Sequence, residues 1–125
     1  MSALRSGGCL CGAVRYEIRG EPLQSGLCHC ADCRKESGSL FSAYAIWPRA
    51  ALTYAGTISV FAGRSFCPHC GGRLFCLTQE KAELRLGSLD GPPVGIEPAQ
   101  EVWIIRRERW LHPVAGAAQF PGDPV

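Results

Sequence analysis

The chain has 125 residues, of which 46% are hydrophobic and 19% charged, and 13 Lys and Arg against 11 Asp and Glu give a formal charge of +2. This length suits one domain with its own core, and the hydrophobic fraction excludes a mainly disordered chain. The charge provides no basic stripe for nucleic acid, and the apolar stretches are too short for a signal peptide or a membrane span. We therefore expect one domain over residues 1–125, located in the cytoplasm, without nucleic-acid or membrane partners.

Short strands separated by turns dominate the predicted structure, because 15 Gly and 9 Pro supply frequent turns. Residues 13–19 alternate between apolar and mostly polar side chains, which is the period of a half-buried strand. Ala31–Ser37 is predicted to form the single helical turn, and the tail from Gly116 is predicted to be irregular. Further strands are predicted at 40–47, 52–54, 57–61, 73–77, 83–87 and 102–107. The pattern predicts a mainly β, compact domain of short antiparallel strands with little helix.

Seven of the eight cysteines fall into three clusters, Cys9-Leu10-Cys11, Cys28-His29-Cys30-Ala31-Asp32-Cys33 and Cys67-Pro68-His69-Cys70. In a chain without a secretion signal, such spacings indicate metal ligands rather than disulfides. A tetrahedral zinc ion needs sulfurs about 3.8 Å apart, and a tight turn between two neighbouring cysteines meets that demand. We expect a closed structural zinc site formed by Cys9, Cys11, Cys67 and Cys70.

The middle cluster offers three thiolates, from Cys28, Cys30 and Cys33, as ligands of a second zinc ion. One coordination position would then be available to a ligand from outside the chain. Because three thiolates donate much charge, this ion would activate water weakly and would be better suited to binding and deprotonating a thiol. The residues therefore predict a thiol substrate. With both ions bound, the protein would be near neutral.

Alternatives remain for several of these residues. Cys67-Pro68-His69-Cys70 also has the spacing of a thioredoxin-type redox pair, although Gly71-Gly72 follows it instead of a helix. His29 and His69 are alternatives as direct ligands, but neighbours of ligands usually point away from the metal. His29 is also a candidate substrate contact. Cys76 lies in an apolar strand context and is either a buried small residue or the fourth ligand of the second zinc ion.

The polar residues that directly follow the middle cluster are candidate substrate contacts. Arg34, Lys35 and Ser37 could hold the carboxylates of a peptide-like thiol. The alternative is a solvated turn.

The three cysteine blocks, in this order, resemble the glutathione-dependent formaldehyde-activating enzyme (GFA) family, which includes centromere protein V. The resemblance covers nearly the whole chain and runs through residues 7–16, 28–38 and 66–72, with weaker support at 87–90, Pro98, Trp110 and 119–120. It implies a mainly β zinc fold with one structural and one active-site zinc ion on the two cysteine sets above. Where many relatives have a His three residues after the proline corresponding to Pro98, this chain has Glu101.

The resemblance also implies an activity, the addition of glutathione to formaldehyde to give S-hydroxymethylglutathione, which is a carbon–sulfur lyase reaction in reverse. The first hypothesis is therefore a zinc-dependent carbon–sulfur lyase that binds a thiol such as glutathione at the three-cysteine zinc. It would form or cleave an S-hydroxymethyl-type adduct with formaldehyde or another small carbonyl compound. The alternative hypothesis is a non-enzymatic, zinc-stabilised module that binds a thiol or another partner.

Overall fold

The computed structural model describes residues 3–124, which divide into two compact units. The first unit comprises the chain up to Leu23 together with Ala45–Gly95, and the second comprises Gln24–Tyr44 together with the chain from Ile96. Most regular structure in both units is β-strand, which confirms the mainly β fold class. One domain over 1–125 stays a prediction. Within residues 3–124, no helix has the length and apolar character needed to cross a membrane.

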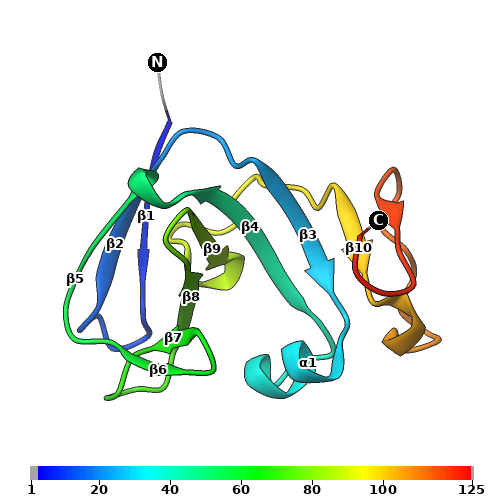
Figure 1. Ribbon diagram of the computed structural model, residues 1–125, viewed down its shortest axis with the longest axis horizontal. Helices are drawn as coiled ribbons and strands as arrows, with labels where there is room; N and C mark the ends of the chain where they lie inside the picture. The colour runs from blue at the N-terminus through cyan, green and yellow to red at the C-terminus, as the bar shows by residue number, and fades with distance from the viewer. Residues whose placement is uncertain (1–2, 125) are drawn as a thin grey trace. The chain divides into compact units, whose positions relative to one another are not determined.

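The first unit contains a three-stranded antiparallel sheet in the order β1-β2-β5, whose strands lie side by side in Figure 1. These strands are β1 (Leu4–Gly8), β2 (Arg15–Arg19) and β5 (Leu52–Ala55). Strand β2 has the predicted alternation, because Tyr16 and Ile18 are buried while Arg15 and Glu17 are exposed. Val14, just before β2, is also fully buried.

Strand β1 was not predicted, because it ends in Gly7 and Gly8 and glycine weakens a strand. The structure gives the reason for both glycines. A Cβ on Gly7 would lie 2.4 Å from the Tyr16 hydroxyl, and a Cβ on Gly8 would lie 2.3 Å from the Val14 carbonyl oxygen. The Tyr16 hydroxyl occupies the space beside Gly7 and forms a 2.6 Å hydrogen bond with Ser88 Oγ. The glycines therefore allow the close approach of β1 and β2.

A second set of antiparallel strands in the first unit follows the order β9-β8-β7-β6. Their bounds are β6 (Ser59–Phe61), β7 (Arg64–Phe66), β8 (Arg73–Leu77) and β9 (Lys81–Arg85). Strand β8 coincides with the predicted strand at 73–77. Its Leu74 and Phe75 are fully buried, as are Ala82 and Leu84 of β9, so these two strands supply much of the core. A short 3-10 helix, η1 (Arg49–Ala51), precedes β5.

In the second unit, β10 (Gln100–Val102) pairs with both β3 (Gln24–Cys28) and β11 (Ala118–Gln119). Both pairings are parallel, so the predicted antiparallel arrangement is wrong for these strands. The helix α1 (Ala31–Ser37) has the predicted bounds and follows directly from β3 (Figure 1). It ends at Gly38, which adopts a left-handed conformation with φ 68°. Strand β4 (Ser42–Pro48), predicted at 40–47, carries the chain from the second unit to the first.

Three other predicted segments differ from the structure. The strand predicted at 102–107 is wrong beyond Val102, because Trp103 has a φ of 57° and the 3-10 helix η3 (Ile104–Arg106) follows. The strand predicted at 83–87 ends at Arg85, where the 3-10 helix η2 (Leu86–Ser88) begins. The tail predicted to be irregular from Gly116 contains β11.

Tyr16 makes the stability of the first unit sensitive to high pH. Burial raises the pKa of Tyr16 to about 12, above the value of about 10 for an unperturbed tyrosine. Because the folded-state pKa is raised, this contribution to stability is present below about pH 10 and is lost as the pH rises through about 12. Tyr16→Phe removes both the ionisable group and the hydrogen bond to Ser88.

We expect Tyr16→Phe to lower the free energy of unfolding by about 1 kcal/mol at pH 7, the value of one hydrogen bond. The deficit should shrink and reverse as the pH rises above about 10, because phenylalanine has no proton to lose. Denaturant unfolding of both proteins at neutral and alkaline pH measures this difference. A deficit that stays constant with pH would contradict the prediction.

Candidate functional site

Four cysteine sulfurs converge in the first unit, those of Cys9, Cys11, Cys67 and Cys70. They all lie within 4.8 Å of one another. The Cys9–Cys11 and Cys11–Cys67 sulfur separations are both 3.7 Å. Four Zn–S bonds of about 2.3 Å in a tetrahedron require about 3.8 Å between sulfurs, so the spacing fits such an ion. The group joins two segments of the chain, since Cys11 and Cys67 are 56 positions apart.

Tight turns bring each pair of these cysteines together. The Gly12 N–H donates to the Cys9 carbonyl oxygen at 3.2 Å, and the Gly71 N–H donates to the Cys67 carbonyl oxygen at 2.8 Å. Both glycines have the positive φ that such turns need, 83° and 75°. The Val14 N–H also donates to Cys9 Sγ at 3.2 Å. Backbone donors of this kind orient the sulfurs and favour their thiolate form.

The four thiols affect one another's ionisation. Although burial raises the pKa of Cys9, hydrogen bonds from the backbone and from neighbouring thiols hold it below its ordinary value. Backbone N–H groups of Cys11 and Gly72 likewise lower the pKa of Cys70. The pKa of Cys11 is raised, because burial and the other thiols outweigh a favourable backbone hydrogen bond. All four become thiolates together only with a cation to offset their repulsion.

Three cysteine sulfurs converge in the second unit, those of Cys28, Cys30 and Cys33, again within 4.8 Å of one another. Cys28 is the last residue of β3, and Cys30 is the N-cap of α1, where its Sγ accepts the Cys33 N–H at 3.3 Å. Cys33 is buried in the first turn of α1. The change from strand to helix therefore brings the three sulfurs together. Hydrogen bonding with Cys28 and burial raise the pKa of Cys33, so full ionisation here also needs a cation.

Both groups consist of thiols, a donor set that suits zinc and other soft metal ions. Among residues 3–124, no histidine nitrogen and no carboxylate oxygen joins either group. The described residues thus supply four ligands to one group and three to the other. Both groups could hold a metal ion. Zinc fits the donor set of both groups and the 3.7 Å sulfur separations of the four-cysteine group.

The three polar residues predicted to contact substrate lie on α1. Arg34 donates to Glu108 Oε2 and to the Arg106 carbonyl oxygen, both at 2.9 Å. Ser37 Oγ donates at 2.7 Å to a carbonyl oxygen of its own helix. Lys35 is exposed. The Arg34–Glu108 pair is 29% and 38% exposed, and an ion pair in that setting contributes little stability, so a substrate carboxylate could replace Glu108.

The structure brings together His29 and Glu101, which the sequence analysis did not combine. His29 Nε2 lies 2.8 Å from Glu101 Oε1, and each side chain is 1% exposed. Although burial raises the pKa of Glu101, hydrogen bonds donated by Gln119, the Val114 N–H and His29 hold it below its ordinary value. The available sequence signal was the acidic residue itself, which lies three positions after Pro98. A carboxylate therefore lies beside the residue between Cys28 and Cys30.

The remaining cysteine and the histidine of the third cluster lie outside both groups. Cys76 is half-buried on β8, and its Sγ lies 3.5 Å from Nη2 of Arg73 and from Nη2 of Arg85. The backbone N–H of His69 donates to Cys67 Sγ at 3.3 Å. The chain enters β8 soon after this cluster, so the helix that a thioredoxin-type pair needs does not follow it.

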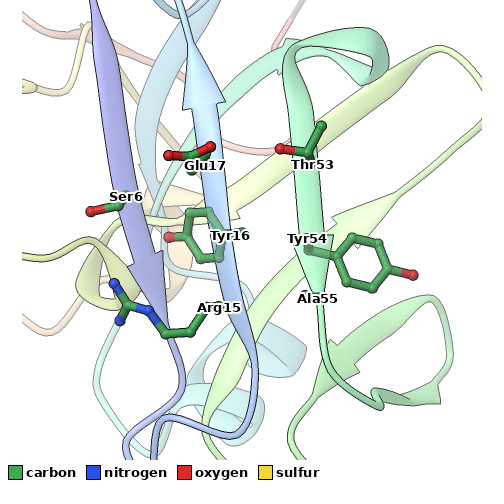
Figure 2. A pocket seen from close by; sticks show the side chains of 7 residues that line it. All are labelled: Ser6, Arg15, Tyr16, Glu17, Thr53, Tyr54 and Ala55. Carbon is green, nitrogen blue, oxygen red and sulfur yellow. The ribbon is translucent and has the colours of Figure 1, made fainter.

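Two pockets in the described part of the first unit are large enough for a small ligand. One, of about 630 Å³, borders the four-cysteine group and includes Cys9 and Cys11 in its lining. The other, of about 480 Å³, lies on the β1-β2-β5 sheet and is lined by Ser6, Arg15, Tyr16, Glu17, Thr53, Tyr54 and Ala55 (Figure 2). Arg15 in this second pocket is already paired with Asp90, and no cysteine lines it. The thiol groups, rather than these pockets, mark the chemically distinctive sites.

Comparison with known proteins adds three findings. The family model described as glutathione-dependent formaldehyde-activating enzyme matches residues 4–106, which include all seven clustered cysteines. An uncharacterized lyase of Schizosaccharomyces pombe is 31% identical over an alignment of 74 residues, and the match covers 55% of this chain and 54% of that protein. The chain therefore matches about half the length of this relative. A crystal structure of a Rhodobacter sphaeroides protein has a similar fold, with a TM-score of 0.56, 24% identity, and coverage of 74% of this chain and 97% of that one.

Metal content distinguishes the two cysteine groups. We expect two zinc ions per wild-type chain and one in Cys67→Ser, because serine replaces a thiolate of the four-cysteine group. The loss should lower the free energy of unfolding by more than about 4 kcal/mol, the range typical of a lost structural metal. Elemental analysis and denaturant unfolding measure both effects.

Cys76→Ser is the matched control, since it removes a thiol outside both groups. It should keep two ions per chain. Two ions in Cys67→Ser, or one in Cys76→Ser, would contradict the assignment of the ligands.

Proposed function

We propose that the chain, which belongs to the glutathione-dependent formaldehyde-activating enzyme family, is a carbon–sulfur lyase. Its substrates would be adducts of a small thiol with a small carbonyl compound. Glutathione and formaldehyde are the proposed pair, and S-hydroxymethylglutathione is the proposed adduct. The lyase name of the Schizosaccharomyces pombe relative supports the reaction class. The proposed cofactors are two zinc ions, one structural and one at the reaction site.

One observation carries this proposal, the convergence of Cys28, Cys30 and Cys33 without a fourth ligand among the described residues. Three-ligand sites are typical of catalytic metals, whereas structural sites are closed by four ligands. A zinc ion held by these three residues would lower the pKa of a thiol that coordinates it. By the same criterion, a zinc ion in the four-cysteine group of the first unit would be purely structural, because four thiols fill its coordination positions.

The proposed reaction needs no oxidant or reductant. In the direction of synthesis, the thiol sulfur forms a bond to the carbonyl carbon, and the π electron pair of the carbonyl group moves to its oxygen. The proton that leaves the thiol is balanced by the proton that this oxygen gains. Cleavage reverses each change. The protein would therefore contribute mainly by holding the two reactants together and by excluding other orientations.

The residues of α1 would hold the remainder of the thiol substrate. Glutathione carries two carboxylates, and Arg34 and Lys35 are the cations that follow Cys33. Arg34 would exchange its exposed partner Glu108 for a substrate carboxylate, while Lys35 is already exposed. Ser37 would offer its hydroxyl oxygen, since its proton is donated within the helix. These roles account for a peptide-like thiol rather than a simple alkyl thiol.

A second candidate function is a thiol-binding module without catalysis. Thiols add to formaldehyde spontaneously, so binding of the product alone could resemble an activity. The three converging cysteine sulfurs also support this candidate, because a zinc ion held by them would bind a thiol whether or not a reaction followed. Rates measured against the uncatalysed reaction separate the two candidates.

Cys30→Ser tests the role of the three-cysteine group. Serine is a favourable N-cap, so its hydroxyl can replace Cys30 Sγ as the acceptor of the Cys33 N–H while the thiolate is lost. We expect the variant to fold and to keep one zinc ion. Loss of a group that only hydrogen-bonds a metal ligand lowers activity about 10- to 100-fold, so loss of a ligand itself should lower the rate by more than that. Exchange NMR of glutathione with formaldehyde measures the rate.

Cys76→Ser is the control for loss of a thiol and should keep the wild-type rate. An unchanged rate in Cys30→Ser would remove this group from the mechanism. A wild-type rate equal to that of buffer alone, with glutathione still bound, would favour the binding module.

A further inference from the structure

The four thiols of the first unit differ in how far solvent reaches them. Cys67 is fully buried and Cys9 is 8% exposed, whereas Cys70 is half-buried. Cys11 is the one exposed thiol of the four. Its Sγ is nevertheless 3.7 Å from both Cys9 Sγ and Cys67 Sγ, so it belongs fully to the group. A set of ligands that is otherwise protected therefore has one member that solvent reaches.

The backbone around the group explains this difference. On the protected side, Gly72 packs closely, because a Cβ there would lie 3.3 Å from Cys70 Sγ. On the other side, a Cβ on Gly12 would meet no atom within 4 Å beyond its chain neighbours. Leu10, which precedes Cys11, is 91% exposed. The turn that carries Cys11 is therefore open to solvent on both flanks.

A pocket of about 630 Å³ borders this thiol. Its lining includes Cys9 and Cys11 but neither cysteine of the third cluster. Five glycines also line it, Gly8, Gly12, Gly72, Gly87 and Gly91. Because glycine has no side chain, these positions leave the pocket open to a small molecule. Since Cys9 is almost buried, such a molecule would meet the sulfur of Cys11 first.

The chemistry of a metal ligand makes an exposed thiol reactive. Cysteine binds a metal as its thiolate, and the thiolate is also the nucleophilic form of the side chain. With a zinc ion bound, Cys11 would therefore be held as a thiolate at the surface. Four thiolates outweigh the charge of one zinc ion, so the filled group is negative and disfavours anions. An uncharged electrophile is the class of molecule that suits this position.

We propose that Cys11 is a modification site for small, uncharged alkylating electrophiles, and that its modification opens the four-cysteine group. The Cys11 sulfur forms a bond to the electrophilic carbon with its own electron pair. The leaving group departs with the pair of the bond that breaks, so no oxidant or reductant is needed. The sulfur becomes a thioether and is no longer a thiolate ligand.

Loss of this ligand would weaken the link between two distant segments of the first unit. Cys11 and Cys67 are 56 positions apart, and the group joins residues 9–11 to residues 67–70. Three thiolates would hold a metal ion less tightly than four, so modification should release it and destabilise the unit. The inference goes beyond the proposed function, because it concerns the cysteine group to which no reaction is assigned.

Timed reaction of the zinc-loaded wild type with iodoacetamide, an uncharged alkylating agent, tests the proposal. Cleavage after Lys and Arg separates the thiols into peptides 6–15, with Cys9 and Cys11, and 65–73, with Cys67 and Cys70. Fragmentation in the mass spectrometer then distinguishes the two cysteines of each peptide. We expect Cys11 to react at least about tenfold faster than the other three, because it is the accessible thiolate.

Release of zinc is followed in Cys30→Ser, where the four-cysteine group is expected to hold the one remaining ion. We expect one ion to be released for each chain modified at Cys11. The mapping of the wild type stands whatever this variant binds.

Gly87→Leu tests whether the pocket is the route to Cys11. Gly87 lines the pocket, and a Cβ there meets no atom within 4 Å, so a leucine side chain can partly fill it. We expect slower alkylation of Cys11 with unchanged zinc content. Thr57→Leu, at an exposed position outside the pocket lining, is the matched control and should react like the wild type.

Each measurement can contradict the proposal. Faster reaction of Cys70, or equal rates for the four thiols, would overturn the assignment to Cys11. Modified Cys11 with the zinc ion retained would overturn the opening of the group. An unchanged rate in Gly87→Leu would remove the pocket from the proposal. None of these results depends on lyase activity, so failure of this proposal is distinguishable from failure of the proposed function.

Discussion

Thiols that lie within 4.8 Å of one another are the constraint on which the rest of this structure depends. Neighbouring thiols cannot all ionise without a cation, and as neutral groups they have little reason to gather. In the first unit this constraint links Cys11 to Cys67, 56 positions away, and so holds the loop before β2 against the loop before β8. The glycines at 12 and 71 serve the same constraint, because their positive φ closes the turns that bring the sulfurs together. Metal binding and folding of this unit are therefore expected to be coupled.

The second unit uses its cysteines differently. Cys30 both caps α1 and contributes a sulfur to the three-cysteine group, so helix and site begin at the same residue. The neighbouring His29 is held by the Val102 carbonyl and by Glu101, and Glu101 is held in turn by the Val114 N–H and Gln119. A buried carboxylate is costly unless it is paired and hydrogen-bonded, and here each oxygen is satisfied. Strand β10 thus fixes the residue between two candidate ligands, and the segment after β10 holds Glu101 in turn.

Sequence patterns correctly predicted the elements whose formation depends mainly on residues close together in the chain. The helix at Ala31–Ser37 and the strand at Arg73–Leu77 were predicted with the observed bounds, since a cap or an apolar run defines each. Strand β1 was missed because its glycines disfavour a strand. The reason for a glycine at position 7 is visible only in the structure, where the Tyr16 hydroxyl occupies the space that a Cβ would need. The strand predicted at 102–107 stops early because Trp103 adopts a left-handed conformation, which its apolar sequence does not indicate. The parallel pairing of β10 likewise depends on partners far along the chain.

The sequence by itself determined the family, the mainly β class and the division of seven cysteines into groups of four and three. The spacing within each cysteine cluster is a local property, and joining the two distant pairs into one closed set follows from the four ligands that a structural zinc ion needs. Only the tertiary structure decided how the residues around the second group are arranged. It pairs Arg34 with Glu108, joins His29 to Glu101 across 72 positions, and leaves His29 Nδ1 buried without a partner among the described residues. Burial and hydrogen bonding depend on which distant segments meet, and no spacing along the chain records that.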